Sequence, residues 1–119
     1  MEELVGRLVA NVGVERGAAE KAVGIILDFL RKEGPADKVQ ALIDKLPGAE
    51  ALLAQQSESG GMFSMGGIMG AGTKMMAAGL SMGQVQSVTR ETIAFAREKL
   101  GEDAIGEIVG AIPGLSQFV

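Results

Sequence analysis

The chain has 119 residues, of which 47% are hydrophobic and 22% charged, and a formal net charge of −4; this length suits one domain with a buried core. Its 11 Lys and Arg are scattered rather than clustered, which argues against binding to nucleic-acid phosphates. Cys and His are absent, which excludes disulfides and thiolate chemistry and removes the usual general base and the commonest transition-metal ligand.

The first half of the chain predicts four helices. Apolar residues recur at helical spacing within each of them, and glycine or proline stands at their ends, at Gly13, Gly34-Pro35 and Pro47-Gly48. The longest of the four runs from about residue 15 to residue 33 and carries a wide apolar face. A short fourth helix follows Gly48.

The second half predicts a similar series. Ser81 begins a long helix that ends at Gly101, and Gln84 completes an S-x-x-Q capping box at its start. Another helix begins at Glu102, and Pro113-Gly114 ends it. The last residues of the chain are again apolar.

The two halves align as an internal repeat. Residues 2–53 match residues 68–119 without a gap, and the matched pairs include Gly6 with Gly72, Gly13 with Gly79, Phe29 with Phe95, and Pro47-Gly48 with Pro113-Gly114. A unit of about 50 residues buries too little surface to be stable by itself. We therefore expect the two repeats to pair and to share one core.

The predicted fold is all-α: a duplicated helical bundle of about eight helical segments with pseudo-two-fold symmetry, in one domain over residues 1–119. We expect the long helices 15–33 and 81–100 near its centre. Residues 54–67, which are rich in Gly, Ser and Met, are expected to form a flexible linker between the repeats. The core must be aliphatic, because the chain has four Phe and no Trp or Tyr.

A Met-rich segment follows the predicted linker. Met62, Met65 and Met69 stand at i, i+3 and i+7, so on a helix they would form one stripe. Methionine fills irregular gaps in cores, and it also forms adaptable surfaces for apolar partners or ligands. Thioethers can bind Cu(I) as well, although the lack of His and Cys argues against a copper site.

Two groups of charged residues favour structural roles. Asp103 and Glu107 lie in the first turns of a predicted helix, where the helix dipole stabilises acidic side chains. Asp28 with Arg31 and Lys32 predicts a solvated face of ion pairs. Serine has no histidine to activate it anywhere in the chain. We therefore expect no enzymatic activity, no metal and no cofactor.

Four short motifs resemble a known family. They are LVANVGV at residues 8–14, LPGAEALL at 46–53, GLSMGQV at 79–85 and IPGLSQFV at 112–119. With the Gly/Met-rich middle, this pattern resembles small bacterial helical proteins of the VcgC/VcgE integron-cassette type, a domain of unknown function. The resemblance implies an all-helical bacterial protein, and it carries over no functional residue.

The function expected from the sequence is a non-catalytic protein that binds itself or another protein. Its contact surface is predicted in the Met/Gly-rich segment, with the apolar anchors Met62, Phe63, Met65, Ile68 and Met69. The start Met1-Glu2-Glu3 lacks the pattern of a secretory signal, so a cytoplasmic location is expected.

Two alternatives remain open. The first is a carrier of a small apolar ligand, such as a fatty acid, held between the repeats; a large apolar cavity would favour it, and a filled core with an exposed Met surface would favour the interaction protein. The second is peripheral membrane attachment through residues 62–82, which the net negative charge disfavours on anionic lipid. We expect neither nucleic-acid binding nor membrane contact.

Overall fold

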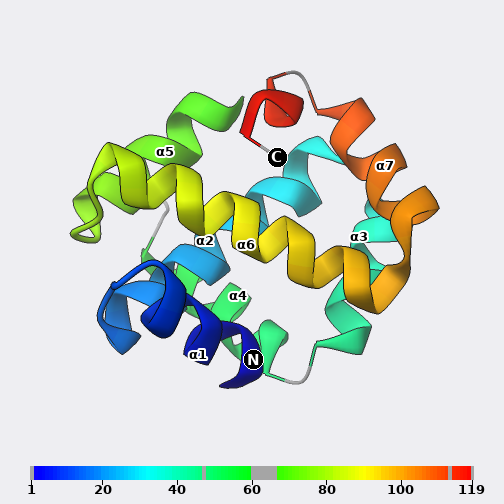
Figure 1. Ribbon diagram of the computed structural model, residues 1–119. Helices are drawn as coiled ribbons and strands as arrows, with labels where there is room; N and C mark the ends of the chain where they lie inside the picture. The colour runs from blue at the N-terminus through cyan, green and yellow to red at the C-terminus, as the bar shows by residue number, and fades with distance from the viewer. Residues whose placement is uncertain (1, 47, 60–66, 113, 119) are drawn as a thin grey trace.

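The computed structural model describes residues 2–46, 48–59, 67–112 and 114–118, and these ranges are helical throughout, with short turns and no β-strand (Figure 1). The all-α prediction is therefore confirmed for the described ranges. Their helices are α1 (Glu2–Asn11), α2 (Arg16–Glu33), α3 (Ala36–Lys45), α4 (Ala49–Ser59), α5 (Gly67–Ala77), α6 (Met82–Leu100), α7 (Glu102–Ala111) and the 3-10 helix η1 (Leu115–Phe118).

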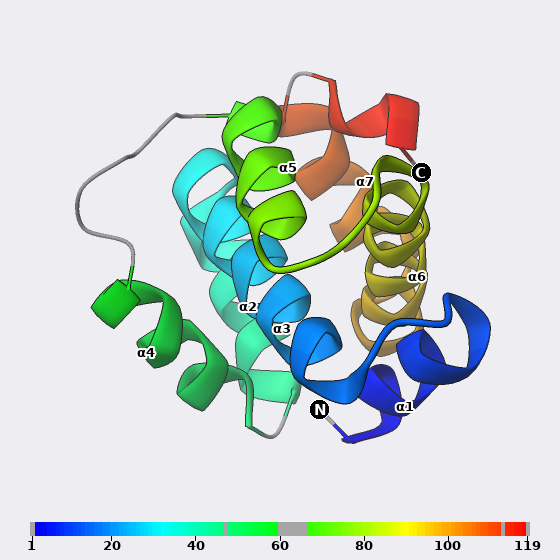
Figure 2. The same cartoon turned by 90° about the vertical axis from the view of Figure 1, so that its left-hand side faces the viewer.

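Helix α2 is the centre of the fold. Every residue from Ala22 to Leu30 is buried, so the helix has no solvent face over this range. It packs against α1, α3, α4, α5 and α6, and Figure 2 shows it in the interior with α4, α5 and α6 around it. One apolar cluster includes residues from all seven of the α-helices described, and so from both halves of the chain.

Helix α6 crosses the front of the molecule in Figure 1. It buries one face and leaves Gln86, Arg90 and Glu98 exposed on the other. The predicted capping box is present: Gln84 N donates to Ser81 Oγ at 3.3 Å, and Ser81 N donates to Gln84 Oε1 at 3.0 Å. These two bonds satisfy backbone and side-chain groups that the first turn of a helix otherwise leaves unpaired.

Two segments are more helical than the sequence pattern predicts. Helix α4 continues to Ser59, so residues 54–59 of the expected linker are helical. The glycine-rich stretch before Ser81 forms α5, which packs on α2 and α6 with Ala71 and Met75 buried. Tertiary packing here overrides the poor helix propensity of glycine.

The ion pairs of Asp28 form as predicted, but the expectation that they are solvated is wrong. Asp28 lies 3.1 Å from Arg31 Nη2 and 3.0 Å from Lys32 Nζ, yet it is only 7% exposed. The two cations lie at the surface and extend to the buried carboxylate. This arrangement compensates for the cost of placing a charge in the interior helix.

Thr92 gives a first test of the core. The residue is 1% exposed, and its Oγ1 has no hydrogen-bond partner among the described residues. Because an unsatisfied buried hydroxyl is unfavourable, Thr92→Val should raise the free energy of unfolding by about 1 kcal/mol. Urea denaturation measures this change.

The matched control for this variant is Thr89→Val, on the same helix. Thr89 is also buried, but its Oγ1 donates to Val85 O at 2.8 Å, so removing it should be neutral or slightly destabilising. Destabilisation by Thr92→Val would mean that its hydroxyl does hold a hydrogen bond in solution.

Gly34 gives a second test, at the end of α2. Its N–H donates to Leu30 O at 2.7 Å, and a Cβ atom at this position would lie 2.8 Å from that same oxygen. Gly34→Ala should therefore lower the free energy of unfolding by about 1 to 3 kcal/mol. Gly6→Ala is the control, because a Cβ there meets nothing within 4 Å and should stabilise α1 by about 0.5 to 1 kcal/mol. Equal effects of the two variants would contradict the close contact.

Candidate interaction site

The predicted contact residues lie mostly where the structure gives no description. Met62, Phe63 and Met65 fall outside the described residues. The backbone of Ile68 and Met69 forms part of α5, but their side chains lie outside the described part. The proposed role of all five therefore stays a prediction.

The turn between α5 and α6 presents two further methionines. Met76 is 47% exposed and Met82 is 57% exposed, whereas their neighbour Met75 is 3% exposed. Leu80, in the turn itself, is buried, and its N–H donates to Met75 O at 3.3 Å. Met75 and Leu80 thus anchor the turn in the core, while Met76 and Met82 on either side of it are exposed. The turn itself lies at the left edge of Figure 1.

This turn lies in an uncharged part of the chain. No charged residue occurs between Lys74 and Arg90, although 22% of all residues are charged. We use the name α5–α6 surface for the exposed residues of this interval, which are Met76, Ala77, Gly79, Ser81, Met82, Gly83 and Gln86. Two of these residues, Met76 and Met82, are large and apolar, and exposed apolar side chains that form one patch are typical of contact sites.

A cleft of about 650 Å³ opens between α1, α4 and the C-terminal part of α6. This volume is in the usual range of ligand pockets, about 300 to 1,000 Å³. Its apolar residues include Val5, Leu52 and Phe95, which are already 92% or more covered. Its charged residues are Glu2, Glu3, Glu20 and Lys99. The cleft therefore offers a ligand a largely covered floor and a charged rim.

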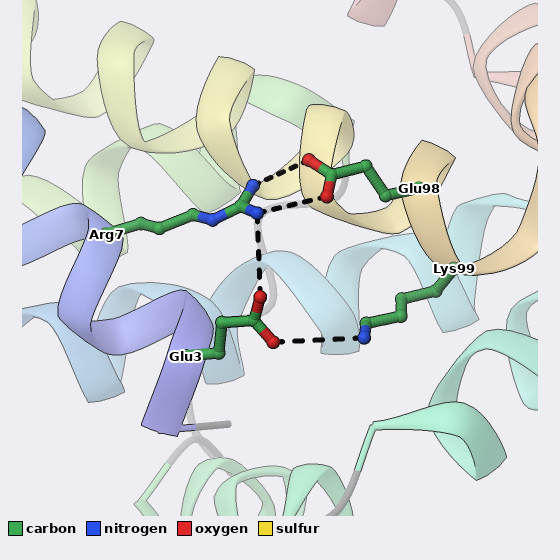
Figure 3. A network of polar contacts seen from close by, with 4 residues as sticks. All are labelled: Glu3, Arg7, Glu98 and Lys99. Atoms are coloured by element: carbon green, nitrogen blue, oxygen red, sulfur yellow. Dashed lines mark hydrogen bonds and ion pairs between the residues drawn. The ribbon is translucent and has the colours of Figure 1, made fainter.

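A network of charged side chains joins α1 to α6 beside this cleft (Figure 3). Arg7 donates to both oxygens of Glu98, at 2.6 and 3.0 Å, and its Nη2 lies 3.6 Å from Glu3. Glu3 in turn lies 3.9 Å from Lys99 Nζ. Both cations lie 5.1 Å from the ring centroid of the buried Phe95, a distance at which the ring face attracts positive charge.

The hydrogen bonds of this network shift two pKa values. The hydrogen bond from Arg7 holds the pKa of Glu98 below its ordinary value, and the same contact raises the pKa of Arg7. Arg16 behaves alike, since its hydrogen bond to Glu2 raises its pKa. Arg7, Arg16 and Lys99 thus each lie next to at least one glutamate, and the pairs made by Arg7 and Lys99 orient α1 against α6.

One of the two carboxylates predicted on α7 forms an ion pair. Glu107 Oε2 lies 2.5 Å from Lys38 Nζ of α3, while Asp103 lies in the first turn of α7. In the described ranges, no group of three or more acidic side chains is placed to hold a metal ion. Among the same residues, no helix combines the length and the hydropathy needed to cross a membrane.

No family model matches the chain, and no curated protein or solved structure shows significant similarity to it. The resemblance of its short motifs to VcgC/VcgE-type proteins therefore stays a prediction. Sequence reasoning did not find the cleft or the Arg7–Glu98 contact, because these residues are 91 positions apart and no local pattern connects them.

The pH dependence of the network can be tested with Glu98→Gln. Because folding lowers the pKa of Glu98, its ionised form stabilises the fold above its unfolded pKa of about 4.3 and loses this effect as pH falls through the lower folded-state value. We expect Glu98→Gln to lower Tm at pH 7, with a difference that disappears by about pH 2. Thermal unfolding followed by circular dichroism measures both.

Salt provides the control for this experiment. The Arg7–Glu98 contact is exposed to solvent, so about 1 M NaCl should reduce the difference in Tm at pH 7 by screening the charges. A difference that is the same at pH 7 and in acid would mean that Glu98 acts through packing and not through its charge.

Proposed function

We propose that the protein is a non-catalytic cytoplasmic interaction protein that self-associates through the α5–α6 surface and the Met/Gly-rich segment that precedes it. The observation that carries this proposal is the exposure of Met76 and Met82 in a stretch of the chain, residues 75–89, that contains no charged residue. Methionine side chains are flexible and polarisable, and they adapt to an apolar partner at little steric cost.

The charge distribution favours a second copy of the chain as the partner. A two-fold interface places the same surface of each copy against itself. The net charge is −4, so two copies repel one another on average, and like charges brought together at a contact are unfavourable. The α5–α6 surface adds no charged side chain of its own to such a contact, because residues 75–89 contain none.

We also propose that the fold is an internal duplication, and the helix bounds support it. Under the alignment of residues 2–53 with 68–119, α1 corresponds to α5, α2 to α6, α3 to α7 and α4 to η1, with starts that agree within one residue. The hydrogen bond of Leu46 N to Ile43 O, at 3.1 Å, has an equivalent in Ile112 N to Val109 O, at 3.2 Å.

Backbone conformation and packing give independent support. Gly13 and its equivalent Gly79 have φ of 85° and 108°, and Gly48 and Gly114 have φ of 89° and 86°, a region that glycine adopts readily. Helix α1 packs on α6, and α5 packs on α2. This reciprocal exchange is what a pseudo-two-fold axis between the repeats would produce.

Under the proposed duplication, the α5–α6 surface has an equivalent corner in the first repeat, between α1 and α2. At the position equivalent to Met82, the first repeat has Arg16, which pairs with Glu2 and Glu20 within its own corner of the molecule. At the position equivalent to Met76 it has Ala10. Two corners of the same origin thus differ in chemistry: one is charged and internally paired, and the other is uncharged and rich in methionine.

A carrier of a small apolar ligand is the second candidate, and the cleft of about 650 Å³ between the repeats supports it. Its charged residues disfavour a fatty acid, because they are three glutamates, Glu2, Glu3 and Glu20, and one lysine, Lys99, which is already near Glu3 and so is not free to bind a carboxylate. We therefore rank self-association first.

The proposed contact can be tested with the double variant Met76→Ser/Met82→Ser. Removing two apolar side chains from each copy should weaken self-association roughly tenfold or more, with little change in Tm because both residues are exposed. Sedimentation equilibrium measures the dissociation constant. Val9→Ser is the matched control, since Val9 is 40% exposed on α1; it should leave association unchanged.

Two outcomes would overturn this proposal. One is a double variant that associates as strongly as the wild-type chain. The other is a monomer that, in native mass spectrometry, carries an extra mass of roughly a few hundred daltons after purification, which is the size of a small ligand and would favour the carrier.

A further inference from the structure

The chain offers an oxidant a narrow choice of targets. It contains seven Met and no Cys, His, Trp or Tyr. Thioethers are therefore the side chains most open to two-electron oxidation by a peroxide, and susceptibility increases with exposure. Three methionines of the described residues lie close together in the sequence and differ sharply in exposure: Met75 at 3%, Met76 at 47% and Met82 at 57%.

We propose that Met76 and Met82 form a methionine-oxidation site for hydrogen peroxide, and that their conversion to sulfoxide weakens self-association while Met75 stays reduced. The first half of this proposal rests on exposure alone. The second half rests on the proposed function, because it requires the α5–α6 surface to be the contact.

The chemical step is balanced with the peroxide as the only co-reactant. The thioether sulfur attacks one oxygen of hydrogen peroxide, and the O–O bond breaks as the S–O bond forms. The departing hydroxide takes the proton of the transferred oxygen and leaves as water. Sulfur is oxidised by two electrons, and the peroxide is reduced by two.

Because Met76 and Met82 are exposed, their oxidation should weaken the contact without unfolding the protein. A sulfoxide is strongly polar, so burying it at an apolar interface without a hydrogen bond is unfavourable. Met76 and Met82 lie in solvent in the single copy, so their oxidation leaves the core intact. Met75 lies in the core with Ala71 and Leu80, where an added oxygen would be destabilising, and its burial protects it.

Peptide mapping tests the site directly. Trypsin cleaves after Lys74 and Arg90, so residues 75–90 form one peptide that contains Met75, Met76 and Met82 and no other methionine. After timed exposure of the folded protein to hydrogen peroxide, tandem mass spectrometry locates each gain of about 16 Da. We expect Met76 and Met82 to oxidise at least about fivefold faster than Met75, and all three at similar rates in denaturant. Equal rates in the folded protein would overturn the site.

Sedimentation of the oxidised protein tests the consequence. Peroxide treatment should weaken self-association of the wild-type chain roughly tenfold or more. Met76→Leu/Met82→Leu keeps two apolar side chains that peroxide does not oxidise, so treatment should weaken the association of this variant much less than that of the wild-type chain. If the leucine variant loses association as strongly as the wild-type chain, methionines elsewhere are responsible and the assignment is wrong.

The two proposals fail in distinguishable ways. A wild-type chain that does not self-associate before treatment would remove the proposed function, whereas the oxidation rates of residues 75–90 would still decide the site. A chain that self-associates, is oxidised at Met76 and Met82, and still binds with unchanged affinity would overturn the oxidative control and leave the contact to be placed elsewhere.

Discussion

The architecture depends on a helix that has no face for solvent. Because every residue of α2 from Ala22 to Leu30 is buried, other helices must cover it on all sides, and α1, α3, α4, α5 and α6 do so. Large side chains such as Leu27 and Leu30 each contribute about 1.5 to 3 kcal/mol when they are buried in this way. Even the charged residue of this range, Asp28, is buried, because its partners Arg31 and Lys32 extend to it from the surface.

The same constraint forms α5 and so positions the proposed contact. Helix α5 has little intrinsic helical preference, because four of its eleven residues, including Gly70 and Gly72, are glycine or threonine. Packing of Ala71 and Met75 against α2 and α6 supplies what propensity does not. Met75 faces the core, whereas Met76, about 100° further round the helix, is not covered by a neighbouring helix and stays 47% exposed.

The surface around the cleft carries ion pairs, whereas the α5–α6 surface has no charged side chains of its own. Around the cleft, Glu3, Arg7, Glu98 and Lys99 pair with one another and hold α1 against α6. Such exposed pairs orient helices and add little stability, and they leave few unpaired groups for a ligand. The α5–α6 surface has no charged side chain of its own, so its residues form no such pairs within one chain. This contrast is the physical reason for proposing the contact there rather than at the cleft.

The sequence by itself determined the local features: the helical class, the breaks at Gly13 and Gly48, and the capping box of Ser81. These depend on backbone preferences and on partners within about four residues, which a single pattern contains. The candidate site was predictable only as a Met-rich region, and the anchors from Met62 to Met69 remain predictions. Only the tertiary structure decided that α4 reaches Ser59, that Asp28 is buried, that Arg7 meets Glu98, and that Met75 is hidden while Met76 is exposed. Each of these depends on which distant helix packs against the residue, and that is a property of the assembled core rather than of its neighbours in the sequence.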